Sequence, residues 1–322
     1  MDLPRFAPML ATPGRLPSAA VDERWAYEVK YDGQRTVVYL PGDGTVLLRS
    51  RSGADITAAY PDLAPLGTAL GNTAAVLDGE IVVFDDAGRS DFERLQSRMG
   101  LAGAPAKAAR MARLVPAHLI LFDVPLLGTG PLASLPYTER RTALESLGLT
   151  GTHWSTPAFI AGHGERALEA TRAAGLEGLI AKRLDSAYEP GVRSRAWIKI
   201  RHLRTADVVV GGWLPGHGRL SDLPGALLLG ERRGGGLRHI GNVGTGWSDS
   251  ERSSLAGLLH GAASADCPFT PPPAVPGARW VLPRLVGEVA YATRTRAGLL
   301  RHPSWHRLRP DLTPEDLDTR TS

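Results

Sequence analysis

The chain has 322 residues, of which 43% are hydrophobic and 22% are charged, a composition typical of a globular protein with about two domains. Its single cysteine, Cys267, excludes an internal disulfide and a Cys/His zinc site, which fits a reducing cytoplasm. We find no secretory signal pattern at the start and no apolar run of the ~20 residues that a membrane helix needs. We therefore expect a cytoplasmic protein with no membrane segment.

The first part of the chain contains clear strand patterns. Residues 25–40 and 74–84 alternate apolar and polar side chains and are rich in Val and Ile, which predicts strands. A tight turn at Asp32-Gly33 would make a hairpin with Lys30 at its lip. Ser90 and Glu93 have the spacing of a capping box, which predicts a short helix after them.

Mixed helices and strands follow up to residue 203, which predicts a single α+β domain. Residues 100–113 are rich in Ala and Gly and carry Lys107, Arg110 and Arg113, so we expect a helix or a mobile surface segment. The remaining patterns predict strands at 118–124, 179–183 and 196–201, and helices at 138–147 and 164–174.

From residue 204 onward, short strands are joined by Gly-rich turns. Together with one helix they predict a small Greek-key β-barrel of the oligonucleotide-binding (OB) type over residues 204–322. The Pro-rich segment 268–276 is expected to be a loop of this domain, and residues 313–322 a frayed or helical tail. The expected strands are 207–213, 225–231, 237–243 and 286–292, and the helix is 248–260.

Two stretches contain several cations and no acid: residues 193–204, which include Trp197, and residues 294–309, which include Trp305. Such stretches are often only solvated surface strands. Two of them, each with an aromatic side chain, favour binding to phosphate.

Residues 28–35 read Glu-Val-Lys-Tyr-Asp-Gly-Gln-Arg. A lysine before Asp-Gly is also common in ordinary hairpins, so this string alone does not decide a function. It resembles the Lys-x-Asp-Gly-x-Arg motif of the covalent nucleotidyltransferases, above all the ATP-dependent DNA ligases. Further elements that resemble this family follow in the same order: Ser50–Gly53, Leu77–Ile81, Leu121–Asp123, Glu177–Lys182 and Trp197–Arg201, in which an arginine replaces the second lysine of the motif.

The resemblance covers nearly the whole chain and is closest to the small bacterial ligases and the ligase modules of bacterial end-joining enzymes. It implies an adenylyltransferase (nucleotidyltransferase) domain over residues 1–203, followed by the OB-fold domain. It also implies that the enzyme seals 5′-phosphate/3′-hydroxyl nicks in DNA, with ATP as cofactor and Lys30 as the residue that carries AMP.

The same resemblance implies roles for other side chains. Glu28 would lie beside the adenine amino group, Phe122 would stack on adenine, and Arg35 and Arg51 would grip ribose or phosphate. Glu80 and Glu177 would hold Mg²⁺ or Mn²⁺, which prefer carboxylate oxygen. The complete set implied to bind the nucleotide is Glu28, Arg35, Arg51, Glu80, Phe122, Lys182, Lys199, Arg201 and Arg309.

Arg309 departs from the family pattern. Many relatives end the OB domain with an Arg-x-Asp-Lys-like element, whereas this chain has Arg309-Pro-Asp-Leu. We therefore expect Arg309 to orient the pyrophosphate leaving group without a matching lysine.

Two other functions remain open from the sequence. An RNA ligase or a capping-type enzyme uses the same lysine chemistry, and a non-catalytic scaffold would bind nicks without sealing them. The expected partners are nicked double-stranded DNA and, in addition, end-joining or repair proteins. We expect a monomer that acts in DNA repair.

Overall fold

The computed structural model describes residues 3–320, apart from the side chains at positions 219, 319 and 320. The chain divides into two compact units, one up to Arg201 and one from His202 onward. We expected this boundary after residue 203. Within the described part of the chain, no helix combines the length and the apolar character that crossing a membrane requires.

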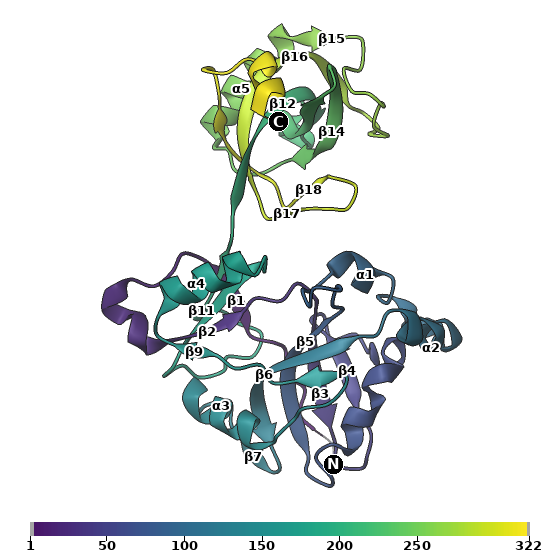
Figure 1. The fold of residues 1–322 in the computed structure, drawn as a ribbon, viewed down its shortest axis with the longest axis vertical. Helices are drawn as coiled ribbons and strands as arrows, with labels where there is room; N and C mark the ends of the chain where they lie inside the picture. The colour runs from purple at the N-terminus through teal and green to yellow at the C-terminus, as the bar shows by residue number, and fades with distance from the viewer. Residues whose placement is uncertain (1–2, 321–322) are drawn as a thin grey trace. The chain divides into compact units, whose positions relative to one another are not determined.

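The first unit contains two sheets and several helices (Figure 1). The sheet that we call sheet A has the order β1-β11-β10-β2-β9, and sheet B has the order β4-β3-β5-β6-β7, with β8 paired to β6. The strands of sheet A are β1 (Leu10–Pro13), β2 (Trp25–Val29), β9 (Ile160–Ala161), β10 (Gly178–Arg183) and β11 (Arg193–Arg201). Those of sheet B are β3 (Gln34–Leu40), β4 (Leu47–Ser50), β5 (Ala75–Val82), β6 (His118–Leu127), β7 (Gly130–Pro131) and β8 (Trp154–Ser155).

The helices of the first unit follow the sequence patterns closely. The segment expected to be a helix or mobile is a helix, α2, and α4 is followed by Gly175 in the left-handed region with φ 69°. The α-helices are α1 (Phe92–Gln96), α2 (Pro105–Leu114), α3 (Tyr137–Ser146) and α4 (Gly164–Ala173). The 3₁₀ helices are η1 (Ala19–Arg24), η2 (Thr57–Ala59), η3 (Pro61–Thr68) and η4 (Leu101–Gly103).

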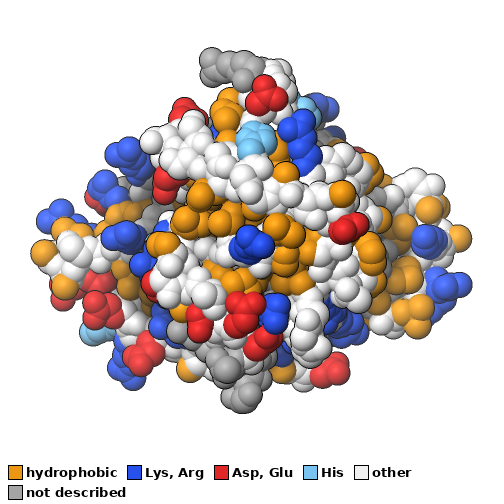
Figure 2. All heavy atoms as spheres, turned by 90° about the horizontal axis from the view of Figure 1, so that it is seen from above, with side chains coloured by type: hydrophobic (Ala, Val, Ile, Leu, Met, Phe, Trp, Pro, Cys, Tyr) orange, Lys and Arg blue, Asp and Glu red, His pale blue; other side chains and the backbone are white. Residues whose placement is uncertain are grey.

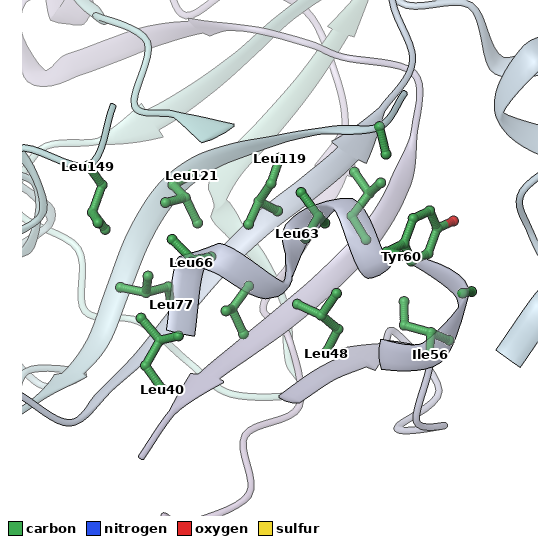
Figure 3. Close-up of a cluster of buried hydrophobic side chains, with 14 of the residues drawn as sticks. Leu40, Leu48, Ile56, Tyr60, Leu63, Leu66, Leu77, Leu119, Leu121 and Leu149 are labelled. Atoms are coloured by element: carbon green, nitrogen blue, oxygen red, sulfur yellow. The ribbon is translucent and has the colours of Figure 1, made fainter. Parts of the chain in front are cut away.

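Leucines of sheet B pack against leucines of helix η3 in the main hydrophobic core of this unit. Leu77, Leu119 and Leu121 of the sheet are fully buried in one cluster with Leu63 and Leu66 of η3 (Figure 3). Each such side chain contributes roughly 1.5–3 kcal/mol on burial. This packing fixes the strands whose other residues line the pocket described below.

The predicted hairpin at Lys30 is wrong. β2 pairs with β9 and β10 in sheet A, whereas β3 pairs with β4 and β5 in sheet B, so residues 30–33 cross from one sheet to the other. Gly33 is required there for a different reason, because a Cβ would lie 2.3 Å from the carbonyl oxygen of Ile81. Local turn chemistry cannot reveal that two neighbouring strands join different sheets.

The predicted capping box of the short helix is also wrong in its details. The N-cap of α1 is Asp91, whose side chain accepts a hydrogen bond from the backbone N–H of Arg94. The Ser90 hydroxyl instead accepts one from the backbone N–H of Asp32, 3.1 Å away. Ser90 therefore supports the crossover that follows Lys30.

The second unit is built on a curled antiparallel sheet with the order β14-β13-β12-β16-β15, and β19 pairs with β16 (Figure 1). Helix α5 (Asp249–Gly261) begins with a true capping box of Ser248 and Glu251. The expected tail forms η6 (Pro314–Arg320), and its last two residues lie outside the described range. The strands are β12 (Arg204–Pro215), β13 (Pro224–Arg233), β14 (Gly236–Val243), β15 (Ala263–Ser264), β16 (Arg279–Tyr291), β17 (Thr293–Arg294), β18 (Leu300–Arg301) and β19 (Ser304–Leu308), with η5 at Gly218–Leu220.

Three of the four predicted strands lie within β12, β13 and β14, and the fourth, 286–292, ends one residue beyond β16; the shorter strands were not predicted. The curled sheet agrees with the expected small barrel. Its further assignment to the OB type stays a prediction.

Candidate active site

A pocket of about 220 Å³ is lined by residues of both sheets of the first unit. Sheet A contributes strands β1, β2, β10 and β11, and sheet B contributes β3, β5 and β6. Most of the predicted site residues line it: Glu28, Lys30, Arg35, Arg51, Glu80, Phe122, Lys182, Lys199 and Arg201. The fold therefore brings together side chains that are up to about 170 positions apart in the sequence.

Strand β11 shows how the sequence achieves this. Side chains alternate between the two faces of a strand, so Trp197, Lys199 and Arg201 share one face, and these three residues and Arg193 line the pocket. Trp197 lies directly opposite Lys182 of β10 in the antiparallel pairing. Part of the cationic stretch recognised in the sequence is thus one wall of the pocket, whereas Arg195 and Arg204 are exposed outside it.

Lys30 follows the last residue of β2, where its backbone N–H donates to the carbonyl of Gly178 at 2.9 Å. Its Nζ forms a hydrogen-bonded ion pair with Oε2 of Glu177. The other oxygen of that carboxylate, Oε1, lies 2.8 Å from Nε of Arg201. One carboxylate therefore holds the amine and the arginine that replaces the motif's second lysine.

Lys182 lies in a closed environment, with only 1% of its side chain exposed. Its Nζ is 2.9 and 2.8 Å from the two carboxylate oxygens of Glu28 and donates to the carbonyl of Phe122 at 3.1 Å. Glu28 also accepts a hydrogen bond from the hydroxyl of Tyr137 and lies 3.5 Å from Nη1 of Arg141. Burial lowers the pKa of Lys182 even though Glu28 acts in the opposite direction.

Aromatic rings form the wall beside this network. Phe122 and Trp197 meet edge to face, with centroids 6.3 Å apart and an interplanar angle of 77°. Lys182 Nζ lies 4.6 Å from the Phe122 centroid and 4.4 Å from that of Trp197, and the Arg35 guanidinium carbon lies 4.5 Å from Phe122. These cation–π contacts hold the rings and the cations in one arrangement.

Lys199 lies between Trp197 and Arg201 on the pocket face of β11 and is the first cation of the motif in which Arg201 replaces the second lysine. Burial lowers the pKa of Lys199, and the neighbouring Arg201, Arg193 and Lys30 lower it further. An anionic ligand would relieve this repulsion.

Glu80 of β5 is the unpaired carboxylate of the site. Burial raises its pKa to about 7, and Asp78 and Asp32 act in the same direction against Arg35 and Lys30. Within residues 3–320, no hydrogen bond or ion pair reaches this carboxylate. Its unsatisfied oxygens fit a role as a ligand of a hard cation.

The described side chains contain no cluster of three or more His, Cys, Asp or Glu that could hold a metal by themselves. Mg²⁺ usually takes one or two protein carboxylates and completes its shell with water and substrate phosphates. Glu80 interacts electrostatically with Lys30, and Glu177 forms an ion pair with it. These two carboxylates are enough for a Mg²⁺ ion of this kind.

Arg51 reaches the pocket from a tight turn after β4. The N–H of Gly53 donates to the carbonyl of Ser50 at 2.8 Å, and Gly53 has φ 85°, a left-handed conformation that favours glycine. The Ser50–Gly53 element is therefore a turn that exposes Arg51 at the pocket.

Arg309 belongs to the second unit and is not among the residues that line this pocket. Its guanidinium lies 2.7 Å from carboxylate oxygens of both Asp207 and Asp311. Other cations of the same stretch are paired as well, Arg307 with Glu288 and Arg294 with Glu231. On the face drawn in Figure 2, Lys and Arg side chains lie among Asp and Glu and not in one continuous basic field.

Comparisons with known proteins cover both units. Residues 8–201 match the family profile "ATP dependent DNA ligase domain", and residues 221–312 match "ATP dependent DNA ligase C terminal region". The chain belongs to the ATP-dependent DNA ligase family. These matches do not favour an RNA ligase, a capping enzyme or a non-catalytic scaffold.

Several relatives of this ligase-family chain are bacterial end-joining proteins. It is 39% identical, over 97% of its length, to the "multifunctional non-homologous end joining protein LigD" of Mycolicibacterium smegmatis, and 36% identical, over 89%, to LigD of Pseudomonas aeruginosa. The chain spans only 39% and 34% of the length of these two relatives.

Solved structures agree with this relationship. The ligase domain of Mycobacterium tuberculosis LigD is 38% identical, with a TM-score of 0.57 and 97% coverage of both chains. A mycobacterial DNA ligase D solved in complex with ATP gives the same values. A Lig E DNA ligase, 21% identical with a TM-score of 0.61, shares the fold.

Several residues at the site were not among those predicted from the sequence. Tyr31, Arg193 and Ile180 line the pocket, and Tyr137 and Arg141 support Glu28 from behind. Arg193 belongs to the cationic stretch noted in the sequence, but alternation from Trp197 would have pointed first to Arg195, which does not line the pocket. Tyr137 and Arg141 are 109 and 113 positions from Glu28, so local sequence could not reveal them.

Proposed function

We propose that this chain is the catalytic core of an ATP-dependent DNA ligase that seals 5′-phosphate/3′-hydroxyl nicks through an AMP carried on Lys30. The proposal depends above all on the arrangement of Lys30. Its amine faces a pocket, is held by the carboxylate of Glu177, and lies among Lys199, Arg201 and Arg35. This combination suits attack on a phosphate.

In the first step the amine of Lys30 attacks the α-phosphorus of ATP. A nitrogen–phosphorus bond forms, the bond to pyrophosphate breaks, and the amine loses a proton. Lys199 and Arg201 counter the negative charge that grows on the phosphate oxygens. Phe122 and Trp197 provide an apolar wall for the base, and Glu28 and Lys182 hold this wall in place.

In the second step a 5′-phosphate oxygen at the nick attacks the same phosphorus and frees Lys30. In the third step the 3′-hydroxyl attacks the 5′-phosphate, which forms the phosphodiester and expels AMP. A Mg²⁺ or Mn²⁺ ion bound by Glu80 and Glu177 would neutralise phosphate charge in these steps. Arg309 of the expected OB domain, residues 204–322, is assigned to the pyrophosphate leaving group.

We further propose that the natural substrate is nicked double-stranded DNA in end-joining repair. The named relatives support this, because the LigD proteins are described as non-homologous end joining proteins. Interaction with other end-joining or repair proteins, action as a monomer and a cytoplasmic location belong to the same proposal.

Incubation with α-labelled ATP and Mg²⁺, followed by denaturing electrophoresis, tests the covalent step. The wild type should retain the label, and Lys30→Ala should lose it entirely because no amine is present to accept AMP. Lys107→Ala, which removes an exposed lysine of α2, is the matched control and should label normally. A Lys30→Ala protein that labels at the wild-type rate would exclude the assignment.

The substrate is tested by sealing matched nicks in DNA and in RNA with ATP, and by replacing ATP with GTP. We expect sealing of the DNA nick with ATP only. Preferential sealing of RNA, or labelling by GTP, would instead support the RNA ligase or capping alternatives.

A further inference from the structure

A closed ring of hydrogen bonds lies beside the pocket and contains three residues that the mechanism above does not use. The Arg35 guanidinium donates to Asp78 from Nε at 2.6 Å and from Nη2 at 2.7 Å. The hydroxyl of Tyr188 donates to the same carboxylate at 2.6 Å and accepts the backbone N–H of Met9 at 3.1 Å. The carbonyl of Met9 completes the ring by accepting from Nη2 of Arg35 at 3.1 Å.

The ring uses a defined part of the guanidinium. Its N–H groups on Nε and Nη2 all have protein acceptors, two oxygens of Asp78 and one of Met9. Within the described residues, no hydrogen bond reaches Nη1 of Arg35. Because Arg35 lines the pocket, Nη1 is the edge that remains for a ligand oxygen.

The ring also connects the two sheets. Arg35 and Asp78 belong to β3 and β5 of sheet B, whereas Met9 precedes β1 and Tyr188 lies between β10 and β11 of sheet A. Tyr188 and Asp78 are both buried, at 3% and 0% exposure. The aromatic side chain of Tyr188 also packs edge to face on that of Trp197, with centroids 5.8 Å apart.

We infer that Tyr188 is a positioning residue for the nucleotide: it fixes Asp78 and Met9, and through them it sets the orientation in which Arg35 presents Nη1 to an oxygen of ATP. This inference rests on the proposed function, because it takes the pocket to be the ATP site. A guanidinium held on three of its five N–H groups binds with little further loss of side-chain freedom. Without the hydroxyl, Asp78 and Met9 lose their shared partner and Arg35 can rotate.

Burial raises the pKa of Tyr188, and Asp78 raises it further. The phenol therefore stays protonated and remains a donor to Asp78 over the pH range in which the enzyme is assayed.

Tyr188→Phe tests the inference, because it removes only the hydroxyl. Tyr39→Phe is the matched control: Tyr39 is on the same strand and face as Arg35, is 4% exposed, and accepts the N–H of Phe6 at 2.9 Å, yet it does not line the pocket. Enzyme–AMP formation is measured against ATP concentration, together with the melting temperature and its shift by ATP.

We expect Tyr188→Phe to raise the KM for ATP by about five- to tenfold, with the maximal rate changed less than about twofold, because the lost hydrogen bond affects ATP only through Asp78 and Arg35. Tyr39→Phe should keep the wild-type KM. In an Arg35→Lys background, whose amine cannot close the ring, adding Tyr188→Phe should raise KM no further.

An unchanged KM in Tyr188→Phe would overturn the inference. So would an equal rise in the Tyr39→Phe control, or effects of Tyr188→Phe and Arg35→Lys that simply multiply, because each would indicate a general structural role. If the wild type itself forms no enzyme–AMP, the proposed function fails, and the inference fails with it. The wild-type assay therefore separates the two failures.

Discussion

The two ends of the pocket each contain a lysine and a glutamate, yet the pairs are built differently. At one end Lys182 is 1% exposed and is enclosed by Glu28, the carbonyl of Phe122 and aromatic rings. At the other end Lys30 is 13% exposed and is held mainly by Glu177. Under the proposed function Lys30 forms and releases a covalent bond, which requires a partner that can dissociate from it, whereas Lys182 supports the wall and can be enclosed completely.

The carboxylates at the two ends show the same difference. Glu28, at the Lys182 end, has Lys182, Arg141 and the hydroxyl of Tyr137 around it. Glu80, at the Lys30 end, has no hydrogen bond or ion pair within the described residues, and burial raises its pKa to about 7. The Lys30 end therefore has an uncompensated carboxylate that a bound cation could neutralise, whereas the charged groups of the Lys182 end are already paired with one another.

The largest effect should come from Lys182→Met. Removing the amine leaves Glu28 buried with reduced compensation, so the free energy of unfolding should fall by about 3 to 5 kcal/mol. Lys30→Met, at the other end, should cost less than about 1 kcal/mol, because Glu177 keeps its ion pair with Arg201, which is 31% exposed. Urea denaturation of both variants measures this, and equal losses would contradict the comparison.

Glu80→Gln should produce a pH-dependent gain of stability in the metal-free and nucleotide-free protein. The folded-state pKa of about 7 lies above the ordinary value of 4.5, so the folded state binds the proton more tightly than the unfolded state. The wild type therefore loses stability as pH rises from about 4.5 to 7, and the neutral glutamine does not.

The difference between Glu80→Gln and wild type should be near zero below pH 4.5 and reach roughly 2 to 3 kcal/mol above pH 7. Urea denaturation across this range in the presence of a chelator measures it. A difference that stays constant with pH would show that Glu80 is as well compensated as Glu28, which would remove the contrast between the ends.

Arg201 should show the smallest of these effects, since under the proposed function Lys199 counters the charge on the same phosphate oxygens. Arg201→Ala should slow enzyme–AMP formation about tenfold. Arg201→Lys should slow it about threefold, because lysine keeps the charge but lacks the planar guanidinium. Arg195→Ala, on the same strand but outside the pocket, is the control. Normal adenylation by Arg201→Ala would mean that Glu177 holds Lys30 without its help.

The sequence by itself determined the family, the order of the elements and most of the pocket. The ordered motifs named most of the residues that line the pocket, and the strand predicted at 196–201 is present as part of β11. These features are local, since they depend on residue identity and on spacing along one strand.

Only the tertiary structure decided how those residues are held. It showed that β2 and β3 enter different sheets and that position 33 has no room for a side chain because β5 passes close by. It also showed that Glu28 and Lys182 form one buried network. It also joined Arg35, Asp78, Tyr188 and Met9 into a ring. These partners are far apart along the chain, and a hydrogen bond depends on distance in space, which local patterns of residue type do not encode.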